Sequence, residues 1–173
     1  AMARLLPLLR DDGQRLALLL EIGQGASDRA ATGQDSPEVV EYATEQAINA
    51  FTEALAIEPA HQGALAHLIS LCQHGGRWAL LAETLERAPH TPAILAALRE
   101  AYENLGQPAD VARVREQELG QLTDRHELIA SARALAELYQ RLEQPENEVR
   151  AWERLYELAP EELGQNDKVL LAL

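Results

Sequence analysis

Apolar residues recur at intervals of three and four positions along most of this chain, a spacing typical of amphipathic helices. Proline, glycine and short polar residues interrupt the pattern where helices begin and end. The pattern predicts helices over about residues 14–22, 37–57, 61–74, 78–87, 93–105, 108–119, 125–142 and 145–158. Alanine, leucine, glutamate, arginine and glutamine, which all favour helix, make up much of the chain. The predicted fold class is therefore all-α, with almost no strand.

Several boundaries have a specific chemical signal. Ser36 and Pro37 suit an N-cap and a first helical position. The pair Gly75-Gly76 suits a left-handed C-terminal cap, and Gly106 predicts a break between two helices. No leucine, isoleucine or valine occurs from Gly23 to Ser36, so we expect a loop there, or a frayed helix end followed by a loop.

The clearest long-range signal is an internal repeat. Residues 97–108 recur 37 positions later as residues 134–145, with seven of the twelve positions identical. A period of 20 to 50 residues is typical of repeat arrays, in which each unit buries its apolar face against its neighbours.

The spacing within these units resembles that of tetratricopeptide repeats (TPRs). Ala47, Phe51, Ala54 and Pro59 fit positions 20, 24, 27 and 32 of the 34-residue unit. Later units match at Leu65, Leu68, Ile69, Cys72, Leu81, Leu85, Leu98, Tyr102, Val111, Leu135, Tyr139, Trp152 and Leu155. Arg115 stands where an aromatic residue is usual and Glu148 where alanine is usual. The resemblance implies a right-handed α-solenoid of antiparallel helix pairs with degenerate repeats.

The repeat spacing also suggests how the chain is divided. We interpret residues 1–2 as a cloning scar and residues 163–173 as the start of a further helix, cut from a longer protein of bacterial character. The first repeat then occupies residues 3–61 and includes about fifteen inserted residues near 26–40. Three more repeats occupy residues 62–91, 92–128 and 129–162. The insertion is either a recognition loop or a passive one.

The resemblance implies that the first helix of each pair lines a concave groove. Carried over position by position, the groove would include Glu21, Ser70, Gln73, His74, Glu100, Glu103, Asn104, Arg133, Glu137, Gln140 and Arg141. We hypothesise that a protein or peptide segment with positive charge pairs with Glu100, Glu103 and Glu137 there. The alternative is that these residues are ordinary solvated helix faces. Groove position 5 is alanine at residues 17, 66 and 96, which argues against the clamp that grips acidic chaperone tails.

Charge and composition exclude several function classes. Fifteen basic and 28 acidic residues give a net charge of -13, so a nucleic-acid partner is not expected. No apolar run is long enough for membrane insertion. The single cysteine neither requires nor excludes export, and a cytoplasmic location is favoured.

The same sequence offers little for catalysis or for metal binding. We find no phosphate-binding glycine loop, no metal-binding pair of histidines and no nucleophile motif, and we expect no cofactor and no enzyme activity. His67 and His74 lie two helical turns apart, about 10 Å, too far to share one metal ion. Cys72 falls at a core position, as do Trp78 and Trp152.

These observations predict a non-catalytic scaffold that binds a protein partner. Two alternatives remain from the sequence. The segment is a structural spacer or self-association element acting through its apolar end, residues 169–173, or it is a regulatory domain of an enzyme elsewhere in a longer chain.

Overall fold

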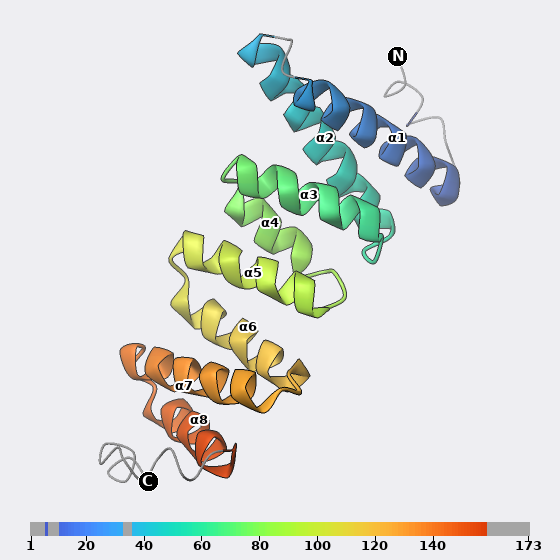
Figure 1. Ribbon diagram of the computed structural model, residues 1–173. Coiled ribbons are helices and arrows are strands. Elements are labelled where there is room, and N and C mark those ends of the chain that lie inside the picture. Colours follow the sequence, from blue (N-terminus) through green and yellow to red (C-terminus); the bar gives the residue numbers. More distant parts are fainter. Residues whose placement is uncertain (1–5, 7–10, 33–35, 159–173) are drawn as a thin grey trace. The chain divides into compact units, whose positions relative to one another are not determined.

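A computed structural model describes residue 6, residues 11–32 and residues 36–158. Within these residues the chain forms α-helices joined by short turns, and no strand occurs in this part (Figure 1). The all-α class is confirmed. In chain order the helices are α1 (Asp12–Ala31), α2 (Pro37–Ile57), α3 (Gln62–His74), α4 (Trp78–Leu85), α5 (Pro92–Leu105), α6 (Pro108–Gln121), α7 (Arg125–Arg141) and α8 (Pro145–Leu158).

The chain divides into two compact units, unit 1 (Ala1–His90) and unit 2 (Thr91–Leu173). In unit 1, α2 packs against both α1 and α3, and α3 packs against α4. In unit 2, α6 packs against both α5 and α7, and α7 packs against α8. Within each unit, each helix thus packs on its neighbour in the sequence, as expected for consecutive helix pairs.

Side-chain caps and prolines start most of the helices. Asp11 Oδ2 accepts a hydrogen bond from the Gln14 amide at 3.0 Å, and Asp124 Oδ1 accepts from the amides of His126 and Glu127 at 2.9 and 3.0 Å. Proline occupies the start of α2, α5 and α6, where its missing N–H removes a donor that has no partner within the helix. Ser36 is the N-cap of α2 as predicted, although its side chain makes no capping hydrogen bond.

Glycines end two helices in the left-handed conformation that favours this residue. Gly76 has φ of +62° and Gly106 has φ of +64°. The left-handed cap predicted at Gly75-Gly76 and the helix break predicted at Gly106 are both confirmed. The Gly106 turn leads from α5 to α6 in unit 2.

The loop predicted from Gly23 is wrong over most of its length, because α1 continues to Ala31. Gly23 and Ala26 continue the buried stripe that begins at Leu19, so small residues occupy these core positions in place of leucine, isoleucine or valine. The helices α1 and α2 have 20 and 21 residues. Residues 33–35 lie outside the described part, and Gly25–Ala31 is helix rather than a recognition loop.

Each unit has its own aliphatic core. In unit 1 the Phe51 ring is 1% exposed and stacks on the His67 ring, with centroids 5.1 Å apart. In unit 2 the fully buried side chains include Leu95, Leu98, Val114 and Leu155. The two tryptophans predicted as core, Trp78 and Trp152, are half-buried instead.

Candidate functional site

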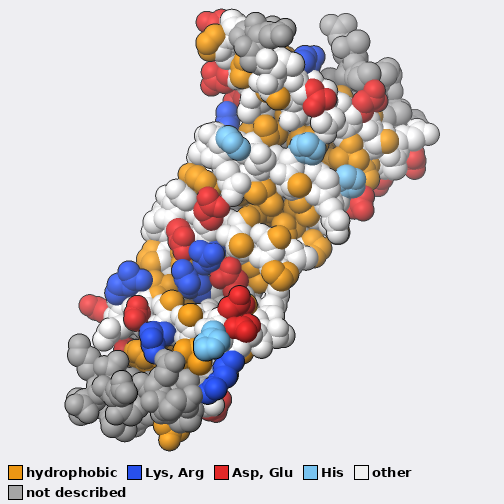
Figure 2. All heavy atoms as spheres, viewed as in Figure 1, with side chains coloured by type: hydrophobic (Ala, Val, Ile, Leu, Met, Phe, Trp, Pro, Cys, Tyr) orange, Lys and Arg blue, Asp and Glu red, His pale blue; other side chains and the backbone are white. Residues whose placement is uncertain are grey.

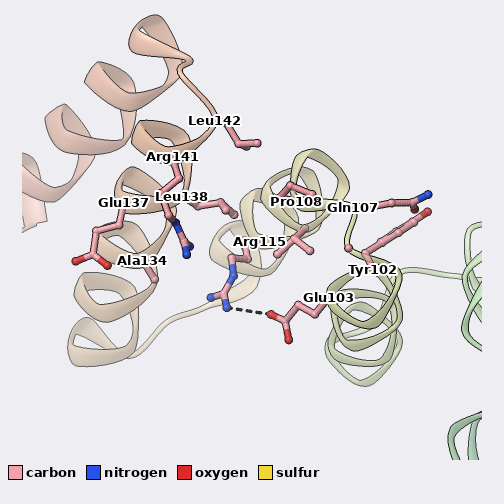
Figure 3. A pocket seen from close by; sticks show the side chains of 12 residues that line it. Tyr102, Glu103, Gln107, Pro108, Arg115, Ala134, Glu137, Leu138, Arg141 and Leu142 are labelled. Atoms are coloured by element: carbon pink, nitrogen blue, oxygen red, sulfur yellow. Dashed lines mark hydrogen bonds and ion pairs between the residues drawn. The ribbon is translucent and has the colours of Figure 1, made fainter. Parts of the chain in front are cut away.

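A pocket in unit 2 lies among α5, α6 and α7 and has a volume of about 480 Å³ (Figure 3). Its position follows from the α5–α6 turn, where the Gln107 amide donates to the Tyr102 carbonyl at 3.0 Å and Pro108 then starts α6. Its apolar lining consists of Tyr102, Pro108, Val111, Ala134, Leu138 and Leu142. Its charged lining consists of Glu103, Arg115, Glu137 and Arg141. The pocket therefore combines an apolar surface with charges of both signs.

A network of four alternating charges fixes one side of the pocket. The Glu103 carboxylate accepts from Arg115 at 3.3 Å and from Arg99 at 3.2 Å. Arg99 also donates through Nε to both carboxylate oxygens of Glu118, at 3.2 and 3.1 Å. The negative charges of the two carboxylates balance the positive charges of the two guanidinium groups in this network. Glu103 is therefore already neutralised by the protein itself.

The carboxylates around Arg99 favour its charged form. Burial by itself lowers the pKa of an arginine, because it disfavours the charged form. The neighbouring carboxylates of Glu118 and Glu103 outweigh that effect and raise the pKa of Arg99 above its ordinary value. Arg99 thus stays charged and holds Glu103 in place beside the pocket.

The α7 wall carries the two remaining charges of the pocket. Glu137 and Arg141 are exposed and lie four residues apart, a spacing that favours an ion pair. Among the described residues, however, no ion pair or side-chain hydrogen bond engages either of them. In Figure 3 the Arg141 side chain extends toward Arg115, whereas the Glu137 carboxylate points away from it.

Three of the predicted groove residues, Glu103, Glu137 and Arg141, line this pocket. The other groove residues of unit 2 do not line it: Glu100 and Asn104 on α5, and Arg133 and Gln140 on α7. Asn104 instead donates its side-chain amide to the Glu100 carbonyl at 2.9 Å. The structure thus gathers part of the predicted groove into one place.

The groove residues predicted in unit 1 lie on two helices. Glu21 is an exposed residue of α1, and Ser70, Gln73 and His74 lie near the end of α3. His74 Nδ1 lies 2.7 Å from the Ser70 carbonyl oxygen. None of these four residues lines the pocket of unit 2.

The surroundings of Cys72 do not favour metal binding by its thiol. Cys72 is 0% exposed, and burial raises the pKa of its thiol to about 11, against the lowering effect of Arg77. Metal ligation needs the thiolate, which this environment disfavours. Within the described part of the chain, no group of three or more histidine, cysteine or acidic residues is placed to bind a metal ion.

Of the four charged residues that line the pocket, Arg115 is the one that the predicted groove did not include. The groove residues were taken from the first helix of each pair, but Arg115 lies on α6, a second helix. The sequence did contain a signal, because Arg115 stands where the repeat pattern usually has an aromatic residue.

Comparison with solved structures identifies the fold. No protein-family model matches the sequence, and no curated protein matches it. The crystal structure of the MamA protein is similar to this chain with a TM-score of 0.50 and 13% sequence identity, covering 92% of this chain and 81% of that one. The chain has a TPR-like fold. A Podosopora anserina protein described as a kinesin light chain with nearly identical TPR-like repeats matches with a TM-score of 0.44 and 20% identity, covering 95% of this chain and 83% of that one.

The surface charge of the TPR-like chain is mixed on the face drawn in Figure 2. Basic side chains on the part that corresponds to unit 2 stand among acidic ones rather than in a continuous stripe. No helix in the described part of the chain has the length and hydrophobicity needed to span a membrane.

Proposed function

We propose that this TPR-like chain is a non-catalytic scaffold that binds a segment of a protein partner in the pocket of unit 2. The observation that supports the proposal most directly is the pocket itself, an opening of about 480 Å³ with an apolar lining and a charged rim. Ligand sites in proteins commonly have volumes of about 300–1,000 Å³ and a few polar groups that fix orientation. A cavity of this size accommodates one or two side chains of a bound segment.

The chemistry of the pocket suits binding rather than catalysis. Glu103 and Arg115 are held in an ion-pair network that fixes one side of the pocket. Apolar residues beside exposed charges instead resemble a protein interface, with an apolar centre and a polar rim.

The basic partner predicted from Glu100, Glu103 and Glu137 stays a prediction. Glu103 is shared by two arginines, and Glu100 also has an interaction within the protein. Reversing these charges would therefore disturb the protein itself as well as a bound partner. A sharper test fills the pocket without changing any charge.

Ala134→Trp provides such a test, because Ala134 is half-buried in the α7 wall of the pocket. Ala130→Trp is the matched control, since Ala130 is an exposed residue of the same helix and does not line the pocket. Native protein and both variants are immobilised, after circular dichroism has shown equal helicity, and incubated with lysate of the source cells. Captured proteins are then quantified by mass spectrometry.

The proposal predicts a protein that the native chain and Ala130→Trp both retain and that Ala134→Trp loses. Equal capture by all three proteins would contradict binding in the pocket. If nothing is captured while light scattering shows a mass that rises with concentration, the self-association alternative is favoured. Capture of an enzyme whose activity changes on binding would favour the regulatory alternative.

A further inference from the structure

The pocket of unit 2 exists at a position where other repeats have a large apolar side chain. Repeat position 24 is occupied by Phe51, Leu85 and Trp152 in the first, second and fourth units. The Phe51 ring and the Leu85 side chain are 1% and 0% exposed, so both fill their inter-helix space. Arg115 occupies this position in the third unit, and its side chain is 26% exposed. The space beside α6 thus lacks the buried apolar side chain that Phe51 and Leu85 supply in the first and second units.

Two charges of the pocket lining stand outside the balanced network, the cation of Arg141 and the carboxylate of Glu137. Arg115 and Glu103 belong to the balanced network with Arg99 and Glu118. Arg141 has no ion-pair partner among the described residues, and its side chain extends from α7 toward Arg115 (Figure 3). Glu137 is on the same helix, but its carboxylate points away from Arg115 in that view.

We propose that the pocket binds an acidic and apolar element of the partner, an inference that rests on the function proposed above. An aliphatic side chain of the partner packs against Val111, Leu138 and Leu142. An adjacent aspartate or glutamate carboxylate accepts hydrogen bonds from the Arg141 guanidinium, whose planar donors match a carboxylate. The occupant is therefore opposite in charge to the basic segment predicted from the sequence.

The net charge of -13 opposes this recognition, but salt weakens the opposition. Near physiological ionic strength the Debye length is about 8 Å, so distant acidic residues are largely screened whereas a direct guanidinium–carboxylate contact is not. We therefore expect an acidic peptide to bind better at 0.15 M than at 0.01 M salt. A basic peptide attracted only by the protein's net negative charge should instead bind better at 0.01 M than at 0.15 M salt.

The experiment uses three capped eight-residue peptides with a fluorescent label, in which leucine alternates with glutamate, glutamine or lysine. Fluorescence anisotropy at 0.15 M salt measures their affinity for the native chain, Arg141→Glu and Arg150→Glu. Arg150 is exposed on α8 and does not line the pocket, so Arg150→Glu makes the same charge change elsewhere in unit 2. Ala134→Trp tests whether the peptides bind in the pocket at all.

The native chain and Arg150→Glu should bind the glutamate peptide up to about fivefold more tightly than the glutamine peptide. This factor is the upper contribution of one exposed ion pair to affinity. Arg141→Glu should reverse that preference, and Ala134→Trp should abolish binding. Equal affinity for the glutamate and glutamine peptides, no binding of the glutamate peptide, or equal loss in the two arginine variants would each overturn the acidic occupant. A lysine peptide that binds the pocket most tightly would restore the basic partner.

The outcomes separate this inference from the function on which it rests. If Ala134→Trp loses a captured protein but the peptides show no preference for glutamate, the scaffold function stands and the acidic occupant is wrong. If Ala134→Trp captures the same proteins as the native chain, both are wrong.

Discussion

Gly23 lies directly against the ring of Phe51, so that a Cβ added at Gly23 would be only 2.8 Å from Phe51 Cε1. Carbon atoms in favourable contact are about 3.5–4.0 Å apart. The ring cannot easily retreat, because it is 1% exposed and stacks on His67 with an interplanar angle of 4°. The close packing of α1 on α2 therefore depends on the absence of a side chain at residue 23.

Gly23→Ala should lower the free energy of unfolding by about 1 kcal/mol. Overpacking a filled core costs about 1–3 kcal/mol, and the better helix propensity of alanine offsets up to about 1 kcal/mol of it. Gly25→Ala is the control, because its added Cβ meets no atom within 4 Å; it should raise the free energy by about 0.5–1 kcal/mol. Urea unfolding followed by circular dichroism measures both, and effects of the same sign would contradict the packing argument.

A double-mutant cycle tests whether Phe51 is the residue that Gly23→Ala disturbs. Phe51→Leu removes ring atoms that the new methyl group would meet. We expect the two changes to be coupled by at least about 0.5 kcal/mol, with Gly23→Ala costing less in the Phe51→Leu protein. If the effects of the two changes on the free energy of unfolding are strictly additive, Phe51 is not the residue that Gly23→Ala disturbs.

Arg115→Phe should fill the pocket of unit 2 and raise the free energy of unfolding by about 1 kcal/mol. Burying a phenyl side chain contributes about 1.5–3 kcal/mol, and loss of the exposed ion pair with Glu103 costs about 0.2–1 kcal/mol. Urea unfolding measures the change. Arg150→Phe on the exposed face of α8 is the control and should give no gain; a similar gain there would show that the effect does not come from the pocket.

Tyr139 connects α7 to α6 through a hydrogen bond from its hydroxyl to Glu116 Oε1 at 2.5 Å. Burial, together with this bond and the negative charge of Glu116, raises the pKa of Tyr139 above its ordinary value of 10.0. Tyr139→Phe removes the bond and should lower the free energy of unfolding at pH 7 by about 1 kcal/mol.

The pH dependence gives a second readout for Tyr139. Below pH 10 both the folded and the unfolded states keep the phenol proton, so the stabilisation is fully present. Above pH 10 the unfolded state loses the proton first, and stability falls by at most about 1.4 kcal/mol per pH unit. The native curve should therefore approach that of Tyr139→Phe at alkaline pH. Tyr42 is 64% exposed, so Tyr42→Phe should leave the dependence of stability on pH unchanged. Parallel stability curves for the native protein and Tyr139→Phe would contradict the assignment of the alkaline loss of stability to Tyr139.

The thiol of Cys72 should be protected from alkylation in the folded protein. Its side chain is 0% exposed, and burial raises its pKa to about 11, so little thiolate is present near neutral pH. A thiol reagent at pH 8 should label the native protein far more slowly than the protein in urea. Equal labelling rates would show that the α3 core opens readily.

The sequence by itself determined the helices whose core positions carry leucine, isoleucine or phenylalanine, and it determined most of their ends. Pro37 and Pro92 at helix starts, and Gly76 and Gly106 at left-handed turns, act through local backbone sterics that operate wherever these residues occur. It also predicted Glu103, Glu137 and Arg141 among the groove residues, because the repeat position places them on first helices.

Only the tertiary structure decided what these residues face. Gly23 and Ala26 do not look like core residues in sequence, yet both are buried, and Gly23 lies against the Phe51 ring of α2. Likewise, only packing shows that Glu103 is neutralised by Arg99 and Arg115, while Arg141 keeps its charge available. Sequence periodicity identifies the buried side of a helix, but contacts between residues 12 or 28 positions apart depend on how the helices pack.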